Sequence, residues 1–229
     1  MPAFSQISPP GLDDTRAVAW GAIGFSQQIG PKWQTTIYLG ASRESNPDNY
    51  SLLNKPAIAV IDVSGLYRFN DRWSLSGAIS FRKQDVYDVD DMEIRDEIRY
   101  YSRLYYRHKI KKISFTYSFR PEFRTYYNST SVPYTYRFRL KAQVAIPLNQ
   151  SGSNQFILGN EILNVAQPHF SDYKYSEDRL TSYFRHTFKK PAVIFDAGFM
   201  YQFLAGEGLI THLAFDVIFL DPFGKHSLN

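Results

Sequence analysis

Cysteine is absent from this chain of 229 residues. Its absence excludes a disulfide framework, metal sites built on thiolates, and thiol nucleophiles. The chain also lacks a run of about 18 apolar residues such as a membrane helix requires, and its mean hydropathy is −0.35. Neither absence excludes a membrane-spanning β-barrel, because a barrel strand needs an apolar residue only at every second position.

Helical periodicity is also missing, and apolar and polar residues instead alternate strictly along most of the chain. In 73–82, for example, Trp, Leu, Gly, Ile and Phe alternate with Ser, Ser, Ala, Ser and Arg. Most of the alternating runs exceed the usual five or six residues of a globular strand and match the tilted crossings of a bilayer barrel. We therefore expect strands at 16–29, 33–43, 57–69, 73–86, 93–109, 113–127, 134–147, 155–165, 177–188, 192–204 and 209–220.

Aromatic residues make up 17% of the chain and gather at the ends of the apolar faces, as Trp33, Trp73, Tyr127 and Tyr134 do. That placement is typical of the aromatic girdles of membrane barrels. Connections are short after odd strands and mostly longer after even ones, like the periplasmic turns and outer loops of such barrels. We expect an all-β fold over 15–229: a closed, antiparallel transmembrane β-barrel of about twelve strands in a Gram-negative outer membrane.

Residues 1–14 have neither the basic start nor the apolar core of a signal peptide. They fit a signal remnant, a short twelfth strand or a lumenal plug, and the consecutive prolines Pro9 and Pro10 make a poor strand because they cannot donate to a ladder. A soluble barrel or sandwich with a ligand cavity is the alternative architecture.

The strand phase predicts a charged lumen in which basic residues outnumber acidic ones. Because an unpaired buried charge is costly, we expect salt bridges that keep the barrel rigid and closed to bulk flow. The alternative is an anion-preferring channel or an anionic-ligand-binding barrel, since guanidinium groups suit carboxylate and phosphate. His212 is expected to pair with Asp216. The expected network comprises Arg95, Glu97, Arg99, Arg103, Arg107, Arg120, Glu122, Arg124, Arg137, Arg139, Lys141, Glu161, Arg179, Arg185, Asp196, His212 and Asp216.

No catalytic site is evident, so we expect a scaffold or partner subunit and no enzyme. A barrel-embedded lipid-modifying enzyme is the less favoured alternative, because only His169 has Ser171 and Asp172 beside it in a long loop, and adjacency is not triad geometry. We expect no metal and no cofactor, since the acidic loops match no calcium-binding spacing. The expected partners are outer-membrane lipid, lipopolysaccharide and a protein of an outer-membrane complex, and not nucleic acid.

Several short motifs occur in a recognisable order. They are Ser8-Pro-Pro-Gly-Leu12, Ala19-Trp-Gly-Ala-Ile23, Arg120-Pro-Glu-Phe-Arg124, Tyr136-Arg-Phe-Arg-Leu140 and Glu177-Asp-Arg179. By their order and spacing the chain resembles, over nearly its whole length, the outer-membrane barrel family called domain of unknown function 2490. The resemblance implies an outer-membrane barrel and no established reaction, so it brings no catalytic residues. Pro121 departs from the usual pattern, and we expect a local bulge there.

Overall fold

The computed structural model describes residues 15–46, 50–52, 55–87, 92–127, 133–168, 172–205 and 208–224, except for the side chains of 85–87 and 92–95. Within these ranges the chain forms eleven strands, and no helix there is long and apolar enough to cross a membrane. The strands are β1 (Ala17–Gln28), β2 (Trp33–Glu44), β3 (Lys55–Arg68), β4 (Trp73–Tyr87), β5 (Met92–Ile110), β6 (Ile113–Tyr127), β7 (Tyr134–Pro147), β8 (Asn154–Ala166), β9 (Tyr173–Lys189), β10 (Ala192–Leu204) and β11 (Leu209–Leu220).

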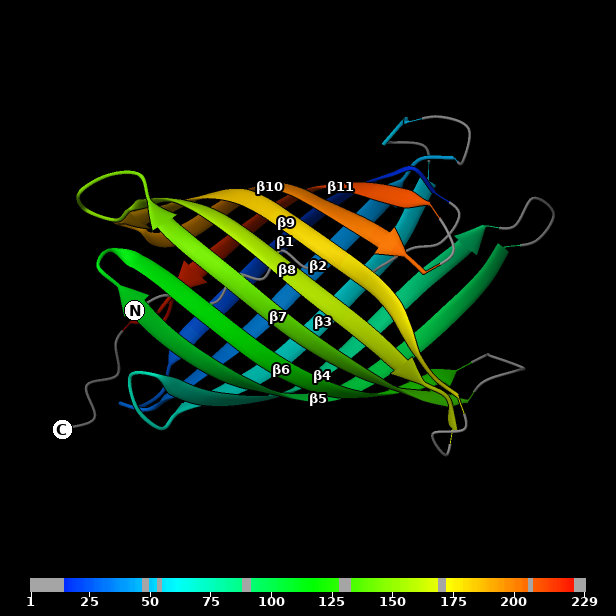
Figure 1. The fold of residues 1–229 in the computed structure, drawn as a ribbon, viewed down its shortest axis with the longest axis horizontal. Coiled ribbons are helices and arrows are strands. Elements are labelled where there is room, and N and C mark those ends of the chain that lie inside the picture. The colour runs from blue at the N-terminus through cyan, green and yellow to red at the C-terminus, as the bar shows by residue number, and fades with distance from the viewer. Residues whose placement is uncertain are drawn as a thin grey trace.

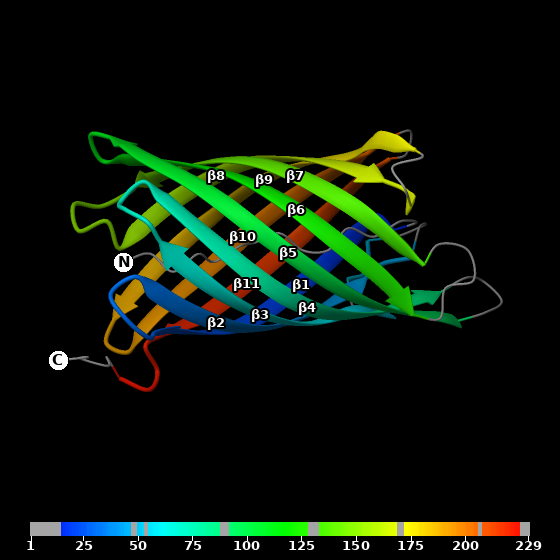
Figure 2. The same ribbon diagram turned by 90° about the horizontal axis from the view of Figure 1, so that it is seen from below.

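The strands form one closed barrel in which each strand pairs with its neighbours in the chain, inclined to the long axis (Figures 1 and 2). The successive pairs are antiparallel, whereas β1 and β11 close the barrel in parallel, from Ala17 opposite Thr211 to Ser26 opposite Leu220. In an up-and-down order of eleven strands the first and last run in the same direction, so closure must be parallel. Closure still leaves no open edge.

The expected all-β closed barrel is confirmed, with eleven strands described where about twelve were expected. The region proposed for a further strand, 1–14, lies outside the described residues. Each expected strand end lies within two residues of the observed one except at β9, which begins four residues earlier, at Tyr173. This extension follows a bulge between Leu163 and Asn164 of β8, beyond which β9 continues to pair.

The expected bulge at Pro121 is wrong. Tyr101 lies opposite Glu122 and Leu104 lies opposite Phe119, so the register of β5 against β6 is the same on both sides of the proline. A proline lacks only the N–H donor, and here the strand accommodates that loss without inserting an extra residue.

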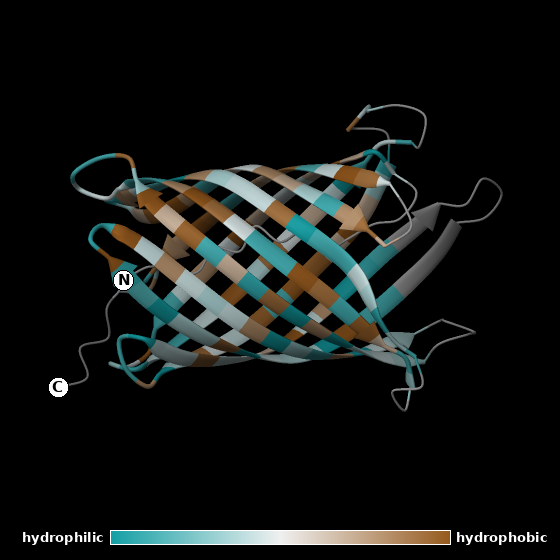
Figure 3. Ribbon diagram, in the orientation of Figure 1, coloured by the Kyte–Doolittle hydropathy of each residue, from teal (hydrophilic) through white to brown (hydrophobic). Residues whose placement is uncertain are grey.

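The outer wall of the barrel is apolar and exposed. Along each strand, hydrophobic residues alternate with hydrophilic ones (Figure 3). The expected phase is confirmed for the outward residues, and large exposed side chains surround the barrel: Ile23, Ile37, Ile61, Leu75, Ile79, Phe81, Leu104, Phe119, Leu140, Leu158, Leu180, Phe199 and Phe215. Aromatic pairs lie toward the ends of the wall, as Trp73 with Tyr106, 4.8 Å between ring centroids, and Phe123 with Tyr134, 5.7 Å.

The interior is divided into a charged side and an apolar side. Inward residues of β1, β3 and β8–β11 form apolar clusters, of which the largest centres on Trp20 and Tyr183. Glycine makes room for the ring of Trp20 and for the close approach of β9 at Tyr183. A Cβ atom on Gly40 would lie 2.3 Å from the Trp20 indole, and one on Gly198 would lie 2.3 Å from the Cβ of Tyr183. The charged side of the interior comes mainly from β4–β9.

Candidate functional site

The charged side of the lumen is almost completely shielded from solvent. Most of its titratable side chains, with those of Asp196 and Asp216 beside them, are between 0 and 9% exposed, and that of Arg124 is 12% exposed. Charges so buried depend on one another for stabilisation, because bulk water does not solvate them. These buried residues are Arg82, Glu97, Arg99, Arg103, Arg120, Glu122, Arg137, Arg139, Lys141, Glu161, Glu177, Arg179, Arg185, Asp196 and Asp216.

Glu97 on β5 gathers arginines from three strands. Arg99 of the same strand donates from Nη2 to the Glu97 carboxylate at 2.7 Å. Arg82 of β4 lies directly opposite Glu97 and approaches to 3.5 Å, and Arg124 of β6 also contacts the carboxylate. Cross-strand neighbours on one face of a sheet are close enough to pair in this way. Glu97 therefore links β4, β5 and β6 through the lumen.

Glu122 on β6 also gathers three arginines, which come from two strands, β6 and β7. The carboxylate lies 2.5 Å from Arg120 Nε, 2.6 Å from Arg137 Nη2 and 2.8 Å from Arg139 Nε. One carboxylate thus faces three guanidinium groups, and two positive charges remain to be balanced by more distant groups. Arg137 also donates a hydrogen bond from Nε to Glu122 Oε2 at 2.6 Å, whereas Nε of Arg120 and Nε of Arg139 approach the carboxylate as ion pairs without hydrogen-bond geometry.

The network continues around the barrel to β10. Arg139 also approaches Glu161 of β8 at 3.4 Å, and Arg179 of β9 lies 3.8 Å from Glu161 and 2.6 Å from Glu177. Beyond this group, Arg185 of β9 makes a bidentate contact with Asp196 of β10, with both N···O distances 2.8 Å. The expected salt-bridged lumen is therefore present over β4–β10.

His212 does not pair with Asp216 as expected. Its Nε2 lies 2.9 Å from Oε1 of Gln202, while Asp216 accepts hydrogen bonds from Trp20 Nε1 at 3.2 Å and the Tyr38 hydroxyl at 2.9 Å. The reason is strand geometry: residues four apart on one strand face the same side but are separated by about 13 Å at 3.3 Å per residue. Asp216 is therefore out of reach of His212, which pairs with Gln202 on the neighbouring strand β10 instead.

The remaining residues of the expected network lie apart from these arginine–carboxylate contacts or outside the described side chains. Arg107 donates from Nη2 to Ser74 Oγ at 3.2 Å, away from the carboxylates that hold the other arginines. Arg103 and Lys141 face the interior but form no ion pair with a described residue. The side chain of Arg95 lies outside the described residues, as do His169 and Ser171 of the loop considered for catalysis. The Asp172 side chain pairs with that of Lys174 at 3.7 Å, and both side chains are exposed.

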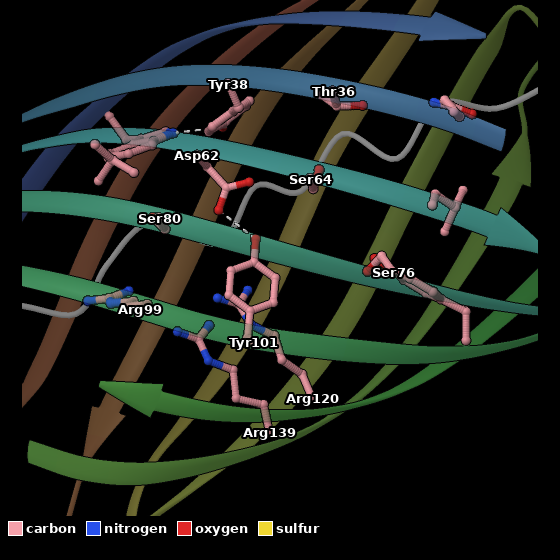
Figure 4. Close-up of a pocket in the computed structure, with 15 residues that line it drawn as sticks. Thr36, Tyr38, Asp62, Ser64, Ser76, Ser80, Arg99, Tyr101, Arg120 and Arg139 are labelled. Carbon is pink, nitrogen blue, oxygen red and sulfur yellow. Dashed lines mark hydrogen bonds between the residues drawn. The ribbon is translucent and has the colours of Figure 1, made fainter. Parts of the chain in front are cut away.

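A cavity of about 130 Å³ lies in the lumen beside the charged side. Arg99, Arg120 and Arg139 line one side of it, and the wall from β1–β4 is mostly polar, with Trp20, Val60 and Leu66 as its apolar members. Figure 4 shows Tyr101 of β5 reaching over β4 to Asp62 of β3, with a hydrogen bond of 2.6 Å from the tyrosine hydroxyl. Sequence reasoning missed these tyrosine and tryptophan contacts, although the alternation alone places Tyr38, Tyr101 and Trp20 inward.

His108 and His186 lie on the outer wall, and each contacts a neighbouring side chain. His108 faces outward and stacks on Phe115, with ring centroids 5.0 Å apart. His186 also faces outward, with Nδ1 2.5 Å from Oδ1 of Asn154. In the part of the chain that the structure describes, no three His, Asp or Glu side chains are grouped so that they could hold a metal ion.

Comparison with known protein families matches residues 17–209 to a family model described as a protein of unknown function, DUF2490. A search of curated proteins gives no match. The matched range includes ten of the eleven strands and every member of the carboxylate–arginine network described above.

Proposed function

This chain belongs to the DUF2490 family, and from its own geometry we propose that it is a structural subunit of the Gram-negative outer membrane. In this role the lumen is closed by salt-bridged side chains, and the outer wall carries the contacts with lipid, lipopolysaccharide and a protein partner. The observation that carries the proposal is the burial of the lumenal charges.

A membrane location is supported by the outer wall. Monomeric soluble proteins rarely expose contiguous apolar patches larger than a few hundred Å², whereas here large apolar side chains are exposed on all sides of the barrel. Trp33, Trp73 and Tyr127 are exposed toward the ends of that wall, where the interfacial girdle of a membrane barrel would lie. A lipid bilayer would surround these side chains with hydrocarbon and so remove them from water.

A closed lumen is supported by the exposure of its charges. Side chains that line a water column are in contact with solvent, yet Arg137, Arg139 and Glu122 are each at most 4% exposed. Barrels that leave an aqueous channel have 16–18 strands, whereas this barrel has eleven described strands. The contacts of Glu97, Glu122 and Glu161 tie together the strands of one side of the barrel, which suits a rigid scaffold better than a pore.

The outer wall over β5–β9 is the face that we propose for a protein partner. Two hollows, of about 510 Å³ and 380 Å³, lie side by side there and share Tyr117, Ala142 and Asn160. Asn160 donates from Nδ2 to Asp178 Oδ1 at 2.6 Å on this otherwise apolar wall. A polar pair in a lipid-facing position is costly and is expected to have a function. An apolar membrane segment that offers a polar group to Asp178 would fit this face.

The test combines conductance with partner retention. The purified full-length protein is expected to be silent in planar bilayers, because buried side chains fill the lumen. A protein that co-purifies from membranes is expected to be lost with Ala142→Trp, because Ala142 lines both hollows and an indole there would obstruct each of them. It is expected to be kept with the matched control Ala59→Trp on the outward face of β3.

Steady anion-selective conductance that disappears when Arg103, Arg137 and Arg139 are neutralised would establish the competing channel function instead. Equal loss of the partner in both tryptophan variants would count against the proposed face. We further propose that the protein has no catalytic role, because His108 and His186 pack against the outer wall and His212 is buried against an amide.

A further inference from the structure

One end of the barrel carries a ring of exposed positive charge. The short turns that join each odd strand to the following even strand lie together at this end, the short-turn end (Figures 1 and 2). Four of these turns, with the strand ends beside them, carry seven exposed basic residues, and none of the seven forms an ion pair with a described residue. We call these residues the basic collar: Lys32, Arg72, Lys109, Lys111, Lys112, Lys189 and Lys190.

The connections at the other end of the barrel have the opposite charge. By the bounds of the strands they are 45–54, 88–91, 128–133, 167–172 and 205–208. Their sequences contain six acidic residues and no lysine or arginine. Two lysines beside these connections have acidic partners, Lys55 with Glu44 at 3.3 Å and Lys174 with Asp172 at 3.7 Å. Charge is therefore separated along the barrel axis, and the basic side chains at the short-turn end are available to an anion from outside the chain.

Exposed tryptophan rings lie directly beside the basic collar. Trp33 follows Lys32 in the sequence and Trp73 follows Arg72, and both rings are exposed on the outer wall. Tryptophan and tyrosine rings are enriched at the headgroup level of a bilayer. In the membrane barrel proposed above, the basic collar would therefore lie at the level of the lipid headgroups or just beyond it.

Lys111 has a backbone conformation that lysine rarely adopts. Its φ is 54°, in the left-handed region, at the first position of the two-residue turn between β5 and β6. Glycine, asparagine and aspartate are the residues that usually occupy such a position. The chain has lysine there and a second lysine at 112, so this turn carries two positive charges despite the backbone strain.

We propose that the basic collar binds the headgroups of anionic phospholipids in the leaflet at the short-turn end. The inference rests on the proposed membrane location and names the class of lipid that this end selects. Ammonium and guanidinium groups donate hydrogen bonds to phosphate oxygens, and each basic residue near an anionic surface favours the contact by about fivefold. The collar residues come from turns spread around the barrel, which suits the surrounding lipid better than a protein docked on one side.

Quenching of tryptophan fluorescence by brominated lipid measures the lipid preference at this end alone. Of the three tryptophans in the chain, Trp33 and Trp73 border the basic collar, and Trp20 is buried inside the barrel. The full-length protein is reconstituted into vesicles of equimolar phosphatidylcholine and phosphatidylglycerol, with bromine on the acyl chains of one lipid or of the other. Brominated phosphatidylglycerol is expected to quench more strongly, corresponding to a severalfold higher relative affinity, and added salt should reduce the difference because it screens exposed charges.

Lys32→Gln combined with Arg72→Gln is expected to remove most of this preference, because these side chains adjoin the two reporting rings. Lys111→Asn combined with Lys112→Gln should also lower it and should fold, since asparagine suits the left-handed conformation of that turn. The matched control is Lys83→Gln combined with Lys174→Gln, which removes two exposed charges at the other end of the barrel. The control should keep the preference of the original protein.

Vesicles of brominated phosphatidylcholine alone test the membrane location separately. Absence of quenching in those vesicles would contradict the proposed function itself. Quenching there, together with equal quenching by the two brominated lipids in the mixture, would overturn the role of the basic collar and leave the membrane location standing. A preference that persists in both collar variants, or that falls as far in the control, would also overturn that role.

Discussion

Glu122→Gln is expected to lower the free energy of unfolding by about 3–5 kcal/mol, the cost of removing one partner of a buried ion pair. The carboxylate lies within 2.8 Å of nitrogen atoms of Arg120, Arg137 and Arg139. Glutamine retains the shape and a hydrogen-bond acceptor but not the charge, so three buried guanidinium groups would lose their nearest counter-charge. Urea unfolding of the protein in lipid vesicles, followed by tryptophan fluorescence, measures the difference.

Asp172→Asn is the matched control for the loss of one carboxylate. Its pair with Lys174 is exposed, with side chains 56% and 64% accessible, and its N···O distance is 3.7 Å. Exposed pairs contribute about 0–1 kcal/mol, so this variant should unfold like the original protein. A double variant that adds Arg137→Met should recover part of the loss, because Arg137 lies directly opposite Glu122. If Glu122→Gln is as mild as Asp172→Asn, the carboxylate does not hold the lumen together.

The strands themselves could be predicted because their signal is local. Alternation with a period of two, interrupted by turn residues, locates the ends of β6, β7, β10 and β11 at the residues that the structure gives. Parallel closure could not be predicted in the same way, because it follows only if the strands number eleven, and the sequence left open a twelfth strand at 1–14. It joins Ala17 to Thr211, residues at opposite ends of the chain, and the sequence of neither strand specifies the direction of its partner.

The inward set of charges could also be predicted, but the pairs could not. The phase of each strand places Arg139 inward, whereas its contacts with Glu122 and Glu161 depend on the stagger between β6, β7 and β8. The apolar side of the lumen is harder still to predict. The sequence of β11 is Leu-Ile-Thr-His-Leu-Ala-Phe-Asp-Val-Ile-Phe-Leu, which is largely apolar on both faces. The alternation therefore does not distinguish the inward face of this strand from its outward face.

Leu140→Arg is expected to impair insertion by about 2–4 kcal/mol, the cost of an arginine at the middle of a lipid-facing strand. Leu140 lies near the middle of β7, faces outward and is 56% exposed. The inward residues beside it, Arg139 and Lys141, are buried. In the proposed membrane barrel the charge would therefore enter hydrocarbon and have no lumenal partner within reach. Urea titration of folding into lipid vesicles gives the free energy, and membrane fractionation gives the amount inserted in cells.

Leu148→Arg tests whether the effect of Leu140→Arg comes from the membrane or simply from placing an arginine at an exposed leucine position. Leu148 is 57% exposed, nearly the same as Leu140, but it follows the end of β7 in the turn to β8. In a membrane barrel that position lies at the interface, where arginine costs about 0–1 kcal/mol. In a soluble barrel both leucines would face water, and both substitutions would be close to neutral. A large effect at Leu140 with a small one at Leu148 thus supports a bilayer around the wall, whereas two small effects would leave the soluble barrel as the better architecture.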